Sequence, residues 1–447
     1  MSCVRSVFLV AASLTALAGA AADAQSGSAR ASAGEVCLGF SEGIRLAADR
    51  APEVSAAEAR LDAAEADLRE ARSLRRPQVS TFGRTSSGDT GLTSNRLENQ
   101  VGIQVSQRVY DFGDARLAIE AARGGVDQRE YEIIAQRLAA ATTLADAYLT
   151  RLEALSMIEV IGERRSYFQR QQRAVAALLQ RGGATRADRA QIDAQLASAD
   201  ADAMELRFLA DRPEYSRIRV SARSGTNLCP GDQVETELRR ALGPLDSIDG
   251  VISAALSHNP EIAARTSAVR SLEAQRERQR RARLPVVEAV GIMSYVYDDL
   301  SEDWDARDRV GVDVSVPLYT GDALGARVDR AQAELELEES TLRALQRGLR
   351  EEAEIAFRRM LSLQSQLVRR EAVEDSQREY FEAIAGEFEF GLGTLPDLID
   401  ARLAYEEAQL DVISARYSML RQQLALLQIT ARMPVGPLQQ EWRAEGE

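Results

Sequence analysis

The chain of 447 residues contains two copies of one sequence pattern, and this repetition limits its possible folds more than any other feature. Pro52 and Pro260 each precede a glutamate, and each stands 25 positions before a further proline, Pro77 or Pro285. Later pairs stand 209 instead of 208 positions apart, which one inserted residue explains: Tyr110 with Tyr319, Gly182 with Gly391, Thr185 with Thr394, and Asp188 with Asp397. An offset kept over more than 130 residues indicates two copies of one structural unit.

The repeats set the domain organisation that we expect. Three of the eleven prolines fall in residues 211–248, which match neither copy, so we expect an insert there. Residues 435–447 are expected to be a flexible C-terminal tail. The two repeats, each with its strand pair, are expected at 36–210 (strands within 77–109) and 249–434 (strands within 285–318).

Residues 1–24 have the pattern of a secretory signal peptide. Arg5 precedes an apolar stretch, which ends in the small-x-small sequence Ala22-Asp23-Ala24. Removal of this segment leaves Cys37 and Cys229, an even number of cysteines in an oxidising compartment. A disulfide between them is one hypothesis, and two buried thiols are the other.

Composition excludes several classes of function. The formal net charge is −14, with 69 acidic and 55 basic residues, which argues against a nucleic-acid partner. One histidine and three cysteines leave little material for a metal site or a catalytic triad. No glycine-rich phosphate loop or nucleophile elbow is present, so we expect neither an enzyme nor a cofactor. Beyond the N-terminus, no apolar run approaches the roughly 20 residues of a membrane helix.

Long helices are predicted in both copies. No proline occurs between Pro77 and Pro213, and apolar residues recur at alternating steps of four and three: Ile134, Leu138, Ala141, Ala145, Tyr148, Leu152 and Leu155. This heptad spacing predicts supercoiled helices. A helix from Asp114 to Gln180 would be about 100 Å long at 1.5 Å per residue. Similar seams run from Leu342 to Leu367 and from Leu410 to Leu427.

Each copy also contains a candidate strand pair. Valines and isoleucines alternate with small or polar residues in 101–106 and 310–316, with partner strands expected at 78–86 and 286–297. Polar loops are expected at 87–97 and 298–306. Such strands of about ten residues are typical of a transmembrane barrel, although a soluble hairpin has the same alternation. Four strands in lipid would leave open edges, so in a membrane several chains must share one barrel.

Together, these features resemble the outer membrane efflux protein family, the TolC-like channel-tunnels, over about residues 36–434. Asn259-Pro260-Glu261 resembles the opening of the family's second repeat. The stretch from Gly391 to Ala401 looks like the family's turn between the last two periplasmic helices. Two further motifs lie where a strand passes into a long helix: Tyr110-Asp111-Phe112-Gly113 and Pro317-Leu318-Tyr319-Thr320-Gly321.

The resemblance implies a mainly α fold with a transmembrane β part. Long helical hairpins would form a periplasmic α-barrel, and four strands from each chain of a homotrimer would form a 12-stranded β-barrel in outer membrane lipid. The insert would be an equatorial belt around the middle of the tunnel.

The implied function is a passive outer membrane channel for type I protein secretion or multidrug efflux. Docking of a periplasmic adaptor and an inner-membrane transporter, either ABC or proton-driven, would open it. The alternative is a soluble periplasmic coiled-coil adaptor or scaffold, which cell fractionation distinguishes from the channel.

Asp397 and Asp400 are the leading site residues. They share a helix face, where simple helix capping is the alternative interpretation. The resemblance implies a ring of six carboxylates at the periplasmic entrance of a trimer. Three nearby arginines are either gate ties to these aspartates or solvated charges: Arg181, Arg186 and Arg189. Candidate adaptor contacts at the two helical turns are Gly182, Thr185, Asp188, Gly391, Gly393 and Thr394.

Overall fold

The computed structural model describes residues 40–88, 96–212, 234–243, 247–298 and 303–433, all of which belong to one compact unit. The predicted signal peptide, the C-terminal tail and most of the insert lie outside these ranges. Cys37 and Cys229, and with them the proposed disulfide, also lie outside. Among the described helices, none combines the length and apolar character needed to cross a membrane.

Helices make up most of the described residues, and they repeat in the order that the sequence predicts. α3 and α9 are each 67 residues long, and they start 209 positions apart, at Asp114 and Ala323. This match confirms the long helices and the duplicated halves. The helices of the first half are α1 (Phe40–Arg50), α2 (Pro52–Ser73), α3 (Asp114–Gln180) and α4 (Arg186–Asp211). Those of the second half are α7 (Ile248–His258), α8 (Pro260–Arg281), α9 (Ala323–Glu389) and α10 (Leu395–Ile429), with α6 (Val234–Leu242) between the halves.

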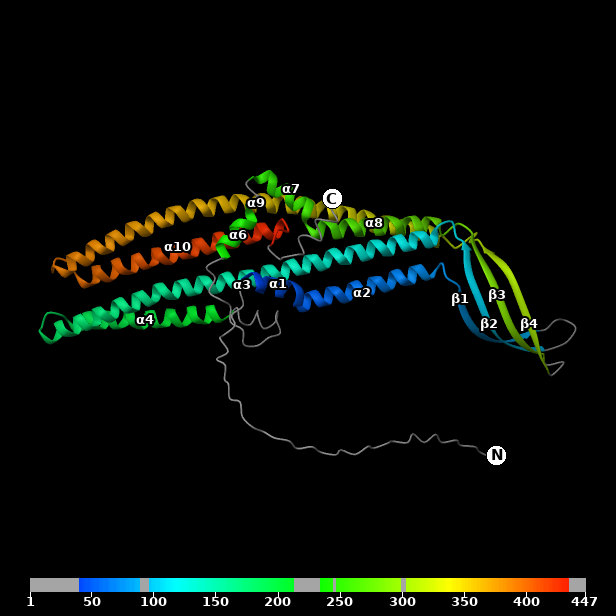
Figure 1. Ribbon diagram of the computed structural model, residues 1–447, viewed down its shortest axis with the longest axis horizontal. Helices are drawn as coiled ribbons and strands as arrows, with labels where there is room; N and C mark the ends of the chain where they lie inside the picture. Colours follow the sequence, from blue (N-terminus) through cyan, green and yellow to red (C-terminus); the bar gives the residue numbers. More distant parts are fainter. Residues whose placement is uncertain (1–39, 89–95, 213–233, 244–246, 299–302, 434–447) are drawn as a thin grey trace, which may run out of the picture. The chain divides into compact units, whose positions relative to one another are not determined.

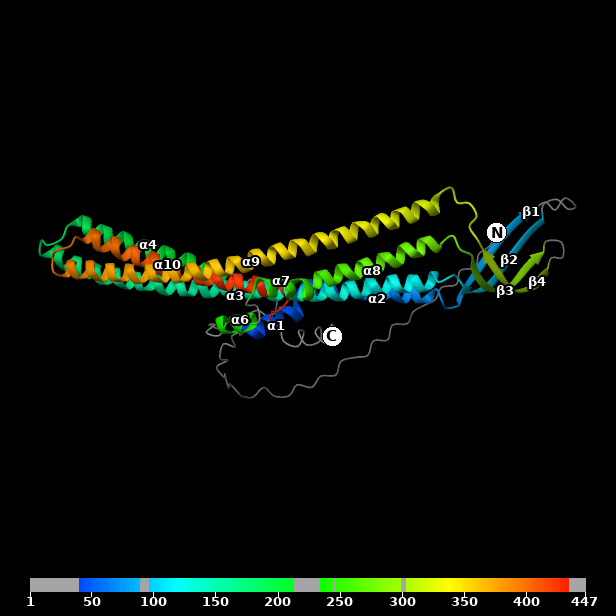
Figure 2. The same cartoon turned by 90° about the horizontal axis from the view of Figure 1, so that it is seen from above.

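The four strands form one antiparallel sheet in sequence order, β1 (Gln78–Gly88), β2 (Arg96–Tyr110), β3 (Val286–Asp298) and β4 (Asp303–Ser315). Pairing of β2 with β3 joins the two repeats. The sheet and the two helical turns lie at opposite ends of α3 and α9 (Figures 1 and 2).

The strands extend further than the sequence predicted. β2 begins inside the expected loop 87–97, and β4 begins inside the expected loop 298–306. Trp304 accounts for the second difference, because it stands opposite Tyr297 in the β3–β4 register. The centroids of the two rings are 5.5 Å apart, and such aromatic pairs stabilise neighbouring strands.

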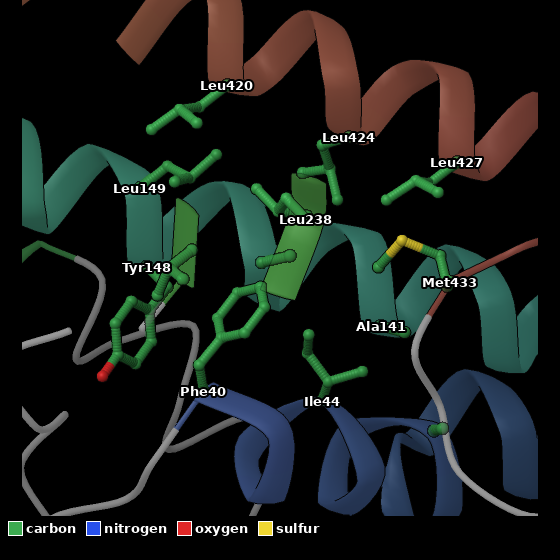
Figure 3. Packing of buried hydrophobic residues seen from close by; sticks show 13 residues of the cluster. Phe40, Ile44, Ala141, Tyr148, Leu149, Leu238, Leu420, Leu424, Leu427 and Met433 are labelled. Atoms are coloured by element: carbon green, nitrogen blue, oxygen red, sulfur yellow. The ribbon is translucent and has the colours of Figure 1, made fainter. Parts of the chain in front are cut away.

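A core at the middle of the long helices joins both halves (Figure 3). Phe40 of α1 packs edge to face against Tyr148 of α3, with ring centroids 5.4 Å apart. Leu238 of α6 and three leucines of α10 complete this core: Leu420, Leu424 and Leu427. Complete burial of each such side chain contributes roughly 1.5–3 kcal/mol. The short helices α1 and α6 are thereby held on α3 and α10.

The predicted seam of α3 is correct at its centre and wrong at its end. Ala141, Ala145 and Tyr148 are buried, but Leu155 remains 38% exposed. From Ala154 onwards, a buried series at seven-residue spacing lies one position before the predicted seam: Ala154, Ile161, Phe168 and Val175. The shift begins where α3 acquires a new neighbour, because α4 returns along α3 from the turn at 181–185.

Candidate functional site

One face of the sheet is mostly apolar across the strands, with Asp308 of β4 as a charged exception opposite Met293. The register places Ile103 of β2 opposite Met293 of β3, and Val105 opposite Gly291, which in turn faces Val310 of β4. Val310 is 90% exposed and Met293 is 67% exposed in the single chain. The other exposed apolar side chains of this face are Val79, Val101, Ile103, Val105, Tyr295, Val312 and Val314.

The opposite face of the sheet is mainly polar and charged on β2 and β4, whereas β3 places the buried side chains of Val290 and Val296 there. Gln100 donates to the Ser294 hydroxyl at 2.9 Å, and Ser294 donates to the backbone carbonyl of Arg307 at 3.0 Å. Charged side chains of this face are Arg84, Arg108, Glu288, Asp303, Asp305, Arg307, Arg309 and Asp313. A sheet with one apolar and one polar face suits a wall between lipid and water.

The two turns at the far end of the long helices have the same local structure. Gly182 and Gly391 both have left-handed backbone conformations, with φ of 77° and 74°, as expected after a helix end. Thr185 and Thr394, the equivalent threonines, cap α4 and α10 by accepting from the backbone N–H three residues later. The repeat therefore preserves the turn as well as the helices.

Asp397 lies in the first turn of α10, beside the capping residue Thr394. Its carboxylate accepts from the Thr394 hydroxyl at 2.5 Å, and Asp188 accepts from the Thr185 backbone N–H at 2.8 Å. Asp400 lies exposed one turn further along α10. Both aspartates are therefore exposed to solvent in the single chain.

The three predicted gate arginines make no contact with Asp397 or Asp400 within the described part of one chain. Arg189 pairs instead with Asp193 at 3.6 Å. Arg181 and Arg186 are exposed, and no ion pair involves either of them among the described residues. Of the candidate adaptor contacts, Gly391 and Thr394 are exposed and Gly393 is half-buried against the backbone of Phe388.

Behind the turns, the two hairpins share a small apolar core. Phe168 and Val175 of α3 pack with Ile192 of α4. The side chains that α10 contributes are Leu395, Leu398 and Ile399. The relative positions of the two turns are therefore fixed by packing within one chain.

Next to this core lies a buried charged cluster that sequence reasoning missed. Arg164 of α3 pairs with Glu406 of α10 at 2.9 Å and also with Asp202 of α4. Arg402 lies one turn from Glu406, and its guanidinium carbon is 5.4–5.6 Å from the centroids of three rings: Tyr167, Phe381 and Tyr405. Rings at this distance attract the cation through their electron-rich faces. The cluster therefore connects all four helices.

Burial controls the ionisation of this cluster. It raises the pKa of the Glu406 carboxyl above its usual value, while Arg164 and then Arg402 oppose the rise. Glu406 Oε2 and Arg164 Nε are buried and lack a hydrogen-bond partner among the described residues. The sequence held one signal: Leu395, Ile399, Arg402 and Glu406 follow one another at steps of four, three and four. Charged residues at core positions of a heptad pattern indicate a buried polar cluster.

Comparison with known proteins links this arrangement to one family. The family model described as outer membrane efflux protein matches residues 43–212 and 251–432, more than half of the chain. The outer membrane efflux protein BepC of Brucella suis is 24% identical over 380 residues, which cover 82% of this chain and 80% of BepC.

Two solved structures have the same fold. A membrane protein from Pseudomonas aeruginosa has a TM-score of 0.77 at 16% identity, covering 88% of this chain and 90% of that one. The CmeC outer membrane channel of Campylobacter jejuni has a TM-score of 0.73 at 15% identity, covering 91% of this chain and 89% of its own.

Proposed function

Because the chain belongs to the outer membrane efflux protein family, and is thus an outer membrane channel component of a tripartite efflux system, we propose that three copies form one conduit. TolC-like channels are trimers that extend into the periplasm. Three copies of this chain bring together twelve strands, four from each sheet. That number is sufficient for a closed barrel with an open lumen. The family match also decides against the alternative of a soluble periplasmic adaptor.

The two-faced sheet is the observation that carries this proposal. Its apolar face, which includes Ile103, Met293 and Val310, would contact lipid, and the face with Arg307 and Arg309 would line the water-filled lumen. Closure through the neighbouring copies satisfies the free backbone groups of β1 and β4, the two edge strands. α3 and α9, each about 100 Å long, then form the periplasmic wall of the conduit.

At the periplasmic end, three copies of Asp397 and Asp400 would form a ring of six carboxylates. Both residues are exposed at the turn, and like charges held close together attract cations. Arg181 and Arg186 of the α3–α4 turn would meet this ring from a neighbouring copy, and Arg189 would do so by exchanging its partner Asp193 for an aspartate of the ring. The entrance is therefore a cation-binding constriction.

The same turns are the docking surface that we propose for the partners of the channel. A periplasmic adaptor would contact the turn residues Gly182, Thr185, Gly391 and Thr394, and it would connect the channel to an inner-membrane transporter, ABC or proton-driven. All four of these residues are exposed in the single chain. Cysteines at Arg186 and at Asp188 would be crosslinked to the adaptor in whole cells, whereas a cysteine at Arg343 of α9, far from the turns, would not.

Conductance in a planar lipid bilayer tests the proposed function. The purified protein should behave as a trimer in native mass spectrometry and should produce stable ionic current steps. A protein that remains a monomer and leaves the bilayer without current would contradict the proposal. Fractionation gives a second check, because the channel should be recovered with the outer membrane.

A further inference from the structure

Five arginines line one cleft where the helices meet the sheet. The cleft has a volume of about 600 Å³ and lies between the end of α2 and the start of α3. Ile119 and Glu120 complete its lining. The arginines, all exposed, are Arg72, Arg75, Arg76, Arg116 and Arg123. A concentration of positive charge in a chain with a net charge of −14 requires an explanation.

Glu120 is the carboxylate in the lining of this cleft, and the neighbouring Asp114 and Glu277 are engaged elsewhere. Asp114 pairs with Arg108 and with Arg278, at 3.0 Å in both cases, and Glu277 pairs with Arg281 at 3.0 Å. Within the described residues, no ion pair involves any of the five cleft arginines. One carboxylate in the lining against five guanidinium groups leaves most of their mutual repulsion unbalanced within the described residues.

Helix electrostatics explain only part of the cleft. Arg72 lies in the last turn of α2, where a cation complements the helix dipole. Arg116 lies in the first turn of α3, where the dipole is positive and disfavours a cation. The positive potential of that helix end adds to the potential of the arginines, and together they favour a bound anion.

The cleft lies next to the sheet, where its apolar face ends. Arg76 stands two residues before β1, and Arg116 stands six residues after the end of β2. Exposed aromatic side chains are found at the same junction: Tyr110 and Phe112 pack edge to face, with ring centroids 4.7 Å apart. Aromatic side chains in this position are typical of the boundary between lipid and water.

We propose that this cleft binds the phosphate groups of anionic phospholipids in the leaflet that faces the periplasm. The proposal rests on the proposed function, because it takes the sheet to lie in the outer membrane. Guanidinium groups bind phosphate oxygens in pairs, and five of them can hold the two charges of adjacent headgroups. Clusters of basic residues beside a membrane-embedded segment recognise anionic lipids in the same way.

A carboxylate from a neighbouring copy is the competing occupant of the cleft. The exposed aromatic residues and the apolar strand ends beside the arginines favour lipid, because an ion pair between copies has no need of apolar neighbours. The two occupants predict different effects of the same substitutions. If the arginines pair with a second copy, neutralising them would weaken the trimer and leave lipid binding unaffected.

Native mass spectrometry of the full-length trimer released from detergent measures bound lipid directly. The probes are phosphatidylglycerol, which is anionic, and phosphatidylcholine, which is zwitterionic. The test variant is R72Q/R75Q/R76Q. The matched control is R347Q/R350Q/R359Q, which removes three exposed and unpaired arginines of α9 that begin about 36 Å along the helix from its start. The triple lysine variant R72K/R75K/R76K restores the charge.

The wild-type trimer and the control should retain phosphatidylglycerol about tenfold better than phosphatidylcholine. The R72Q/R75Q/R76Q variant should lose most of this preference, and the lysine variant should keep most of it. The single variants R116Q and R123Q, each with the rest of the cleft intact, should show a smaller loss in the same direction and give a second measurement.

Two results would overturn the proposal. One is unchanged retention of phosphatidylglycerol by the glutamine variants. The other is a folded monomer from R72Q/R75Q/R76Q, which would assign the cleft to the neighbouring copy. Bilayer conductance separates this proposal from the proposed function: lost lipid preference with normal current supports the lipid site, whereas a wild-type protein without current refutes the channel.

Discussion

Arg164 of α3 donates to the carboxylate of Glu406 of α10 across 2.9 Å, and these two side chains are only 7% and 4% exposed. The pair joins a helix of the first repeat to a helix of the second, close to the turns at the periplasmic end. Removing two charges from water is costly, and their attraction offsets that cost only while both partners are present. The pair therefore makes the alignment of the two hairpins sensitive to either partner.

Loss of the Arg164 guanidinium should lower the stability of the protein strongly. The substitution Arg164→Met leaves Glu406 buried with a weaker neighbouring charge, so we expect a loss of roughly 3–5 kcal/mol at neutral pH. The loss should shrink at acidic pH, because a protonated Glu406 no longer needs the cation. Chemical denaturation of the solubilised protein at several pH values measures it. Arg165→Met, which removes an exposed arginine of the next position, serves as the control.

Substitution of Glu406 should change the stability of the protein in a different way from substitution of Arg164. Burial raises the pKa of Glu406 above 4.5, so the native state holds a proton that the unfolded state has lost. Stability contributed by Glu406 is therefore fully present below 4.5 and falls as the pH rises through the raised pKa. Glu406→Gln removes this dependence.

The free energy of unfolding of Glu406→Gln, relative to wild type, should thus improve as the pH rises from 4 to 7. Denaturation curves of both proteins at each pH measure this difference. A relative stability of Glu406→Gln that declines over the same interval would show that Arg164 and Arg402 outweigh the burial of the carboxyl.

The two faces of the sheet should tolerate charge differently. Val310→Lys places an ammonium on the apolar face, where it should cost about 2–4 kcal/mol at the centre of a bilayer and less near its edge. Gly311→Lys is the matched control. Gly311 is the next residue along β4, it lies on the opposite, polar face, and the space around an added Cβ is open. The yield of trimer in the outer membrane should fall for Val310→Lys and remain normal for Gly311→Lys. Equal yields would argue against a lipid-facing side.

Neutral entrance residues should weaken the binding of cations. The double variant D397N/D400N removes six charges from the proposed trimer while keeping side chains of similar size. We expect block of the channel by divalent cations in planar bilayers to require at least about tenfold more cation. Asp188→Asn, in the equivalent turn of the first repeat, should leave block unchanged. Identical block of D397N/D400N and wild type would show that the proposed carboxylate ring does not bind the blocking cations.

The helical framework could be predicted because its signals are local. Pro52 and Pro260 mark the first residues of α2 and α8. The long helices α3 and α9 are indicated by a stretch without proline and by apolar residues at heptad spacing. The strand ends were harder to place, because polar residues such as Asp303 and Asp305 are typical of a loop, and here they belong to the polar face of β4. Their alternation with Trp304 becomes clear only from the pairing with β3.

The buried charges could not be recognised with the same ease. Arg164 and Glu406 are 242 positions apart in the chain, and each alone is indistinguishable from a solvated helix residue. Only the packing of four helices removes them from water. For Asp397 and Asp400 the difficulty is different. The sequence motif identifies both residues, but the partners proposed for them belong to other copies of the chain.

The identical lengths of α3 and α9 have a consequence for any protein that approaches the free end of the assembly. Three copies would offer six turns of equal construction, alternating between the first and second repeat around the rim. Only the second kind carries both aspartates, because Gln191 occupies the position equivalent to Asp400. The rim would therefore be nearly sixfold symmetric in shape and threefold symmetric in charge. A partner that recognises the shape of the turns would find six equivalent binding sites, whereas a partner that recognises the negative charge would find three.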